Sequence, residues 1–116
     1  MSYDCYMQID TGGEYPATVA EMGNYTSNCS PMWRKAISEA TKRNCGLGDL
    51  EGKTGAELIP ILEAAVSHMR HPANRADYTA LNPTNGWGEY ASAAKYLEGI
   101  LTACREHPKA FLHVSA

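Results

Sequence analysis

Apolar and polar positions alternate near both ends of the chain. In residues 2–9 one apolar set falls on a single face of an extended strand: Tyr3, Cys5, Met7 and Ile9. Alternation with a period of two is typical of a half-buried β-strand. Residues 110–114 repeat the pattern, and residues 15–22 predict a further strand, which Pro16 confines to a sheet edge because proline cannot donate a ladder hydrogen bond.

Between these strands, apolar residues recur at spacings of three and four, which predicts three amphipathic helices. The first helix begins at Ser30, because serine is a good N-cap and Pro31 suits the first helical position. It is expected to end near Asn44, with Gly46 as its terminator. The polar residues 23–30 before it predict an ordered loop.

The second and third helices have equally distinct boundaries in the sequence. Thr54 and Glu57 form the pattern of a capping box, which places a helix start at Thr54. His71 precedes a proline and marks the end of that helix. After a polar connection over residues 72–85, apolar spacing predicts the third helix over residues 86–106.

Together these elements predict the fold class. Strands at both ends with helices between them indicate an α+β fold. We expect a small antiparallel or mixed sheet, formed by the N- and C-terminal strands, with three helices packed on one face. The chain has 116 residues, the length of one domain, so residues 1–116 are taken as a single α+β domain.

Charge and hydropathy argue against several classes of partner. The chain carries 10 Lys and Arg against 13 Asp and Glu, so general nucleic-acid binding is not expected, because phosphate affinity needs excess cations. No apolar run approaches the roughly 20 residues of a membrane span, and we expect no membrane partner. The first residues lack the basic and apolar regions of a signal peptide. We therefore expect a cytoplasmic protein whose four cysteines are free thiols.

Several sequence patterns resemble known functional motifs but lack residues that those motifs require. Residues 46–54 resemble a phosphate-binding loop, but the motif requires glycine where Leu47 stands. A weaker alternative is an anion held by Lys53 and the free N–H groups of the following helix. His68 and His71 lie one turn apart, yet a metal site needs three or four ligands, and we favour the interpretation that the pair caps a helix end. We predict no enzymatic activity, no metal and no cofactor.

Two polar segments carry the candidate binding residues. Both are rich in Asn and Thr, and both lead into a predicted helix with a Trp near its start. Short amides and hydroxyls cap helices and turns, or they bind the polar edges of a small ligand whose ring stacks on Trp or Tyr. The candidate ligand-binding residues are Asn24, Thr26, Asn28, Trp33, Arg34, Asn82, Asn85, Trp87 and Tyr90.

The binding hypothesis assigns each residue type a role. Amide and hydroxyl groups hydrogen-bond the ligand, Trp87 or Tyr90 stacks on its ring, and Arg34 binds phosphate through paired N–H groups. The hypothesis requires the two segments to meet in space. It places Asn28 and Trp87 on the wall of one shared hollow.

Three stretches resemble a family of small proteins that phages and prophages encode, mostly in Gram-positive hosts. They are residues 24–34, 52–62 and 82–88, the last reading Asn-Pro-Thr-Asn-Gly-Trp-Gly, and the opening Ser-Tyr-Asp of residues 2–4 is similar too. The resemblance implies a phage origin and a host-cytoplasm setting, and no particular reaction. Phages use proteins of this size as sponges that sequester nucleotide immune signals without cleaving them. That analogy favours ligand binding.

We therefore expect a phage-encoded, non-enzymatic, anti-defence protein that binds and sequesters a small nucleotide-derived immune signalling molecule. A homo-oligomer is compatible with a domain of this size. Two alternatives stay open. A protein–protein inhibitor of a host enzyme would use the seven Tyr and two Trp residues. A small hydrolase of a nucleotide signal would use a cysteine and a histidine that meet only in space.

Overall fold

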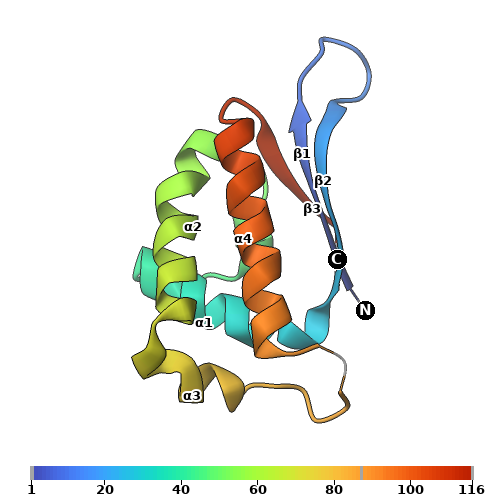
Figure 1. Ribbon diagram of the computed structural model, residues 1–116. Coiled ribbons are helices and arrows are strands. Elements are labelled where there is room, and N and C mark those ends of the chain that lie inside the picture. The colour runs from blue at the N-terminus through green and yellow to red at the C-terminus, as the bar shows by residue number, and fades with distance from the viewer. Residues whose placement is uncertain (1, 87, 116) are drawn as a thin grey trace.

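The computed structural model describes residues 2–86 and 88–115. The chain forms a three-stranded antiparallel sheet with strand order β2-β1-β3. Its strands are β1 (Ser2–Ile9), β2 (Ala17–Thr26) and β3 (Phe111–Ser115). The helices all lie on one face of this sheet (Figure 1), so the predicted α+β class and one-sided packing are confirmed.

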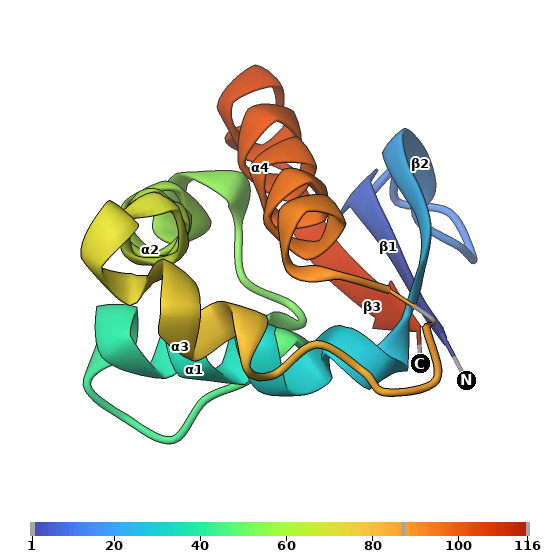
Figure 2. The same ribbon diagram turned by 60° about the horizontal axis from the view of Figure 1, so that its bottom comes forward.

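Four α-helices and three short 3-10 helices make up the helical layer that the structure describes. The α-helices are α1 (Ser30–Thr41), α2 (Gly55–Arg70), α3 (Arg75–Thr79) and α4 (Tyr90–Glu106). The 3-10 helices are η1 (Ser27–Cys29), η2 (Leu47–Leu50) and η3 (Pro72–Asn74). Helix α4 lies nearest the sheet, α2 lies beside α4, and α1 crosses below both (Figures 1 and 2). None of the described helices is both long and apolar enough to span a membrane.

The capping box at the start of α2 is confirmed. The Thr54 hydroxyl accepts a hydrogen bond from the Glu57 N–H at 3.2 Å, and a Glu57 carboxylate oxygen accepts one from the Thr54 N–H at 3.0 Å. Two more N–H groups of the first turn bind carbonyls just before β3: Gly55 binds Ala110 at 2.8 Å, and Ala56 binds Pro108 at 2.9 Å. These bonds fix the start of α2 against the end of α4.

Three predicted boundaries were wrong. Residues 23–26 belong to β2, because residues 24–26 pair with the start of β1, and only η1 remains of the predicted loop over residues 23–30. Helix α1 ends at Thr41 instead of near Asn44, since Lys42 takes a left-handed conformation with φ 59°. Its N–H then binds the Ser38 carbonyl and closes the helix before any glycine is reached.

The third boundary error concerns α4, which begins at Tyr90 instead of residue 86. Gly86 has φ +76° and Gly88 has φ +98°, both outside the helical range. The spacing of apolar residues alone did not indicate that the chain before Tyr90 is not helical. As a result, residues 82–86 and 88–89 belong to a loop that reaches the sheet before the helix starts.

The centre of the core is a cluster of aromatic rings between β1, β2, α1 and α4. Trp33 is fully buried, and its ring centroid lies 5.4 Å from that of Tyr3, 5.7 Å from that of Tyr25 and 5.6 Å from that of Tyr96. On β1, Cys5 and Met7 point into the core as predicted. Further along β1 the same face is exposed to solvent, because the tip of the β1–β2 hairpin extends past the helices (Figure 1).

Candidate functional site

The predicted binding residues at the end of β2 are held by contacts within the chain. The Asn24 amide donates hydrogen bonds to the Ser2 hydroxyl at 2.7 Å and to Asp4 Oδ1 at 3.2 Å, both across the β1–β2 pair. The Thr26 hydroxyl accepts a bond from the Asn28 N–H at 3.3 Å, and Asn28 itself is exposed. Asn24 and Thr26 therefore stabilise the end of the hairpin and the turn into α1.

Trp33 and Arg34 also have structural partners. The Trp33 indole donates a 3.1 Å hydrogen bond to the Ala93 carbonyl, and complete burial removes its ring from any surface that a ligand could reach. The Arg34 guanidinium donates a 2.8 Å bond to Asn44 Oδ1 and lies 3.8 Å from a carboxylate oxygen of Asp49. These bonds hold the loop that follows α1.

Side chains of the second predicted segment stabilise the start of α4. Asn82 Oδ1 accepts a 2.8 Å hydrogen bond from the Tyr90 N–H, so its side chain caps that helix. The Tyr90 hydroxyl donates to the Met69 carbonyl, and its ring stacks on Tyr78 with centroids 5.9 Å apart. Asn85 lies in the loop before α4. Trp87 lies outside the described residues.

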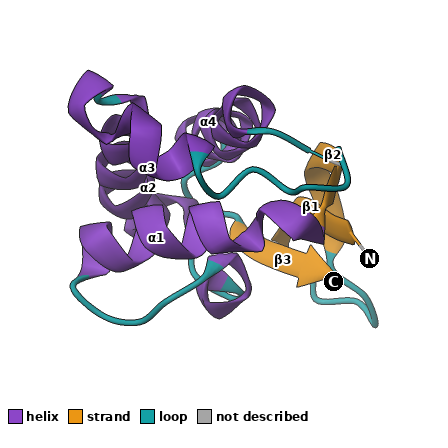
Figure 3. Ribbon diagram, turned by 90° about the horizontal axis from the view of Figure 1, so that it is seen from below, coloured by secondary structure: helices purple, strands orange, loops and turns teal. Residues whose placement is uncertain are grey.

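The two segments do meet, as the binding hypothesis required. A Cβ on Gly88 would lie 2.6 Å from the Thr26 methyl and 2.7 Å from the Cys29 sulfur, so only glycine allows this approach. The Tyr25 hydroxyl lies 3.3 Å from both the N–H and the carbonyl of Glu89. In Figure 3 the loop between α3 and α4 crosses to the end of β2 before it returns to α4. The two segments meet by close packing. The expected placement of Asn28 and Trp87 on one hollow is not described, because Trp87 lies outside the described residues.

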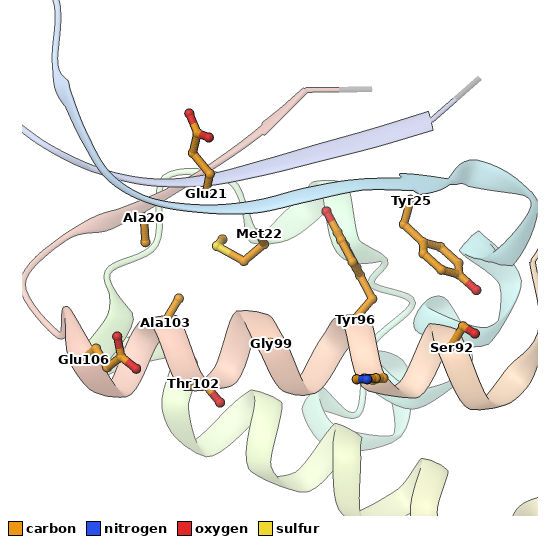
Figure 4. A pocket seen from close by; sticks show the side chains of 11 residues that line it. Ala20, Glu21, Met22, Tyr25, Ser92, Tyr96, Gly99, Thr102, Ala103 and Glu106 are labelled. Carbon is orange, nitrogen blue, oxygen red and sulfur yellow. The ribbon is translucent and has the colours of Figure 1, made fainter.

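A hollow on the described surface lies next to this contact, between β2 and α4 (Figure 4). It is an open groove with a volume of about 480 Å³. Its walls come from one strand and one helix face: Ala20, Glu21, Met22, Tyr25, Ser92, Lys95, Tyr96, Gly99, Thr102, Ala103 and Glu106. Of the predicted binding residues that the structure describes, none lines this groove.

Two tyrosine rings form one end of the β2–α4 groove. The ring centroids of Tyr25 and Tyr96 lie 5.4 Å apart, and the Tyr96 hydroxyl donates a 2.8 Å bond to the Gly23 carbonyl. Burial raises the pKa of both phenols, so each keeps its proton near neutral pH. The rings are thus fixed, uncharged surfaces that bring α4 against the edge strand.

The charges along the groove are unevenly distributed. Lys95 and the Ser92 hydroxyl accompany the tyrosines on α4, whereas Glu106 lies three helical turns further along, at the other end. Glu21 lies on β2 at the rim, and its carboxylate points away from the groove (Figure 4). The groove therefore offers a cation and a hydroxyl beside the aromatic rings, and one carboxylate acceptor, Glu106, away from them.

The remaining candidate chemistry is used for structure. His68 Nδ1 lies 2.6 Å from the Tyr78 hydroxyl, and His71 Nδ1 accepts a 3.1 Å bond from the Ala73 N–H, so His71 caps the start of η3 and not the carbonyls at the end of α2. Over residues 2–86 and 88–115, no three His, Cys, Asp or Glu side chains gather in a way that would hold a metal ion. The alternative anion site fails as well, because carbonyls before β3 already accept the first N–H groups of α2.

All four cysteines are free thiols, as expected from the sequence. Burial raises the pKa of Cys5 and of Cys104 to about 11 in each case. Burial also raises the pKa of Cys29. A thiol with a raised pKa has little of the thiolate form that nucleophilic catalysis requires.

Comparison with known proteins finds no matching family model, no similar curated protein and no similar solved structure. The resemblance to phage proteins thus stays a hypothesis that rests on the sequence stretches alone. The function must be argued from the groove itself.

Proposed function

We propose that this protein is a non-enzymatic binding protein that takes up a small nucleotide-derived molecule in the groove between β2 and α4. The observation that carries the proposal is the fixed pair of Tyr25 and Tyr96 rings beside Lys95. The groove volume of about 480 Å³ falls in the range of about 300–1,000 Å³ that small-molecule sites occupy.

The lining groups match the parts of such a ligand. A flat base would lie along the tyrosine rings, and its phosphate would meet the Lys95 ammonium and the Ser92 hydroxyl. Sugar hydroxyls or an exocyclic amine would donate to the carboxylate of Glu106. Because the groove holds one cation and one carboxylate, a ligand with few phosphates fits it better than a polyphosphate.

A peptide strand would be the other natural occupant of a groove between an edge strand and a helix. The edge strand β2 argues against that occupant. Its pairing with β1 has two register shifts, between Asp4 and Tyr6 and between Met7 and Gln8, and Gly23 has φ +78°. Such irregularities twist an edge and weaken strand addition, so the small ligand is favoured.

The phage setting supplies the biological part of the proposal. The sequence stretches that resemble phage proteins support a ligand that is a nucleotide immune signal of the host. The protein would sequester that signal in the host cytoplasm and release it unchanged. A binding protein of this kind needs a groove that holds the ligand, with no group that attacks it.

Titration calorimetry tests the proposal. The protein is titrated with AMP, cyclic dinucleotides and cyclic ADP-ribose isomers, in the wild type and in Lys95→Gln. We expect one of these ligands to bind, and Lys95→Gln to weaken it about fivefold, since an exposed charge pair contributes about 1 kcal/mol. The matched control Lys109→Gln removes an exposed charge outside the groove and should leave affinity unchanged. Absence of heat with all three ligand classes, in folded protein, would refute the proposal.

The hydrolase alternative is tested on the same samples. After incubation and denaturation of the protein, chromatography shows whether the ligand is intact. Recovery of the intact ligand supports sequestration. Recovery of fragments would replace binding with hydrolysis as the function.

A further inference from the structure

The tip of the β1–β2 hairpin presents an isolated aromatic side chain to solvent. Tyr15 is 76% exposed, and only Ile9, at 39%, joins it among the exposed large hydrophobic residues that the structure describes. The tip extends beyond the helical layer (Figure 1). Exposed aromatic residues at the end of a projecting element are typical anchors of protein contacts.

This tip is ordered by its own hydrogen bonds. The Gly12 N–H donates a 2.8 Å bond to Asp10 Oδ1, and the Thr11 hydroxyl lies 3.4 Å from the Tyr15 carbonyl. Gly12 has φ +78°, which suits the turn. A loop that is fixed before binding loses little conformational entropy when it docks.

The hairpin is also acidic throughout. Residues 2–33 contain four carboxylate side chains and no Lys or Arg: Asp4, Asp10, Glu14 and Glu21. Asp10 and Glu14 flank Tyr15 at the tip, and both are exposed. A partner surface for this tip must therefore combine an apolar recess with positive charge.

The same molecule carries such a recess. A hollow of about 270 Å³ lies between the end of α1, the loop before α2, and α2 itself. Its lining residues are Thr41, Arg43, Asn44, Cys45, Asp49, Leu50, Lys53 and Ile61. None of them belongs to the hairpin, so the tip and this basic recess are separate surfaces of one chain.

The chemistry of the basic recess complements that of the tip. Ile61 supplies a partly exposed apolar wall, whereas Leu50 is fully buried. Within the described part of the chain, neither Arg43 nor Lys53 forms an ion pair, whereas Asp49 lies 3.8 Å from Arg34. The volume is below the range of about 300–1,000 Å³ usual for small-molecule sites, and a single side chain fits it better.

We propose that the hairpin tip of one copy docks into the basic recess of a second copy. The Tyr15 ring fills the hollow against Ile61, and the carboxylates of Asp10 and Glu14 face Arg43 and Lys53. The contact joins two different surfaces, so it is heterologous, and it buries a small area. We therefore expect weak, concentration-dependent association that falls as salt screens the charges.

Sedimentation velocity of the full chain tests this proposal. A concentration series is run at low and at high salt for the wild type and for Tyr15→Ala, which should lower the association constant about tenfold or more. Charge reversal gives a sharper test. Glu14→Lys alone and Lys53→Glu alone should each weaken association, and the double variant should restore it because the pair is reversed together.

The matched control is Asp77→Lys, which makes the same charge change at an exposed position on α3. It should leave association as in the wild type, and circular dichroism confirms that every variant is folded. A wild type that stays monomeric at all concentrations would overturn the proposal. So would association that survives Tyr15→Ala, or single reversals that the double variant fails to rescue.

Discussion

The indole nitrogen of Trp33 donates a 3.1 Å hydrogen bond to the backbone carbonyl of Ala93. This bond joins α1 to α4 at the centre of the aromatic cluster, 60 residues apart in the chain. The same ring packs against Tyr25 and Tyr96, which form one end of the β2–α4 groove. The core and the groove wall are therefore one packed unit.

Replacement of Trp33 should destabilise the whole fold. For Trp33→Ala we expect a loss of about 3–5 kcal/mol in the free energy of unfolding, because a large buried ring and its hydrogen bond are removed. Trp33→Phe should lose less, since a ring remains. Urea unfolding measures both. The control Lys109→Ala, at an exposed position, should stay within about 0.5 kcal/mol of the wild type.

The same substitution should have opposite effects at two glycines. A Cβ at Gly55 would lie 2.6 Å from the His107 carbonyl oxygen and 2.8 Å from that of Cys104, so Gly55→Ala forces α2 away from α4. We expect a loss of about 1–3 kcal/mol. Gly99 faces open space on α4, and Gly99→Ala should gain about 0.5–1 kcal/mol from helix propensity. Thermal unfolding measures both, and a destabilising Gly99→Ala would contradict the placement of α4.

Stability should depend on the charge of Glu57. Hydrogen bonds from the Thr54 N–H and hydroxyl lower the pKa of the Glu57 carboxyl. A lowered pKa in the folded state adds stability above the unfolded pKa of about 4.3, and that stability is lost as pH falls through the folded value. The wild type should therefore exceed Glu57→Gln in stability at about pH 7, and the difference should shrink at about pH 3.

Urea unfolding at the two pH values checks this. The control is Glu106→Gln on α4, where the carboxylate is exposed and forms no hydrogen bond with the described residues. Its difference from the wild type should change less with pH. A difference between wild type and Glu57→Gln that stays constant would show that the capping box does not depend on the carboxylate.

The four thiols should react at different rates. The pKa of about 11 at Cys5 and at Cys104 leaves little thiolate at about pH 8, and both side chains are buried. Cys45 is half-exposed in the basic recess. We expect iodoacetamide to modify Cys45 at least about tenfold faster than Cys104 in folded protein. Cys45→Ser should remove the fast phase measured by intact mass, whereas equally fast labelling of Cys104 would contradict its burial.

Local patterns in the sequence predicted the parts of the fold that local interactions determine. The alternation in β1 identified Cys5 and Met7 as core residues, and the Thr54 capping box located the start of α2. These features depend on residues that are close in the chain. They are therefore visible without knowledge of the tertiary structure.

Long-range contacts determined what the sequence did not reveal. Residues 24–26 look like part of a polar loop, yet they form the end of β2 because β1 pairs with them. Asn82 suggested ligand binding, but its side chain caps a helix that starts eight residues later. Short amides serve both purposes, and only the tertiary structure separates them.

The groove itself had no sequence signal. Ala20, Met22 and Gly99 are ordinary residues of a strand and a helix, and they become a site only when β2 and α4 are brought side by side.

The central claim is that the β2–α4 groove is the binding site, and a ¹⁵N–¹H correlation titration tests it most directly. Labelled protein is titrated with the nucleotide that calorimetry identifies. The account predicts that the amide signals of Met22, Tyr25, Lys95 and Gly99 shift together and saturate at one affinity. Shifts that gather instead around Asn28 and Asn82, with those groove signals unmoved, would contradict it.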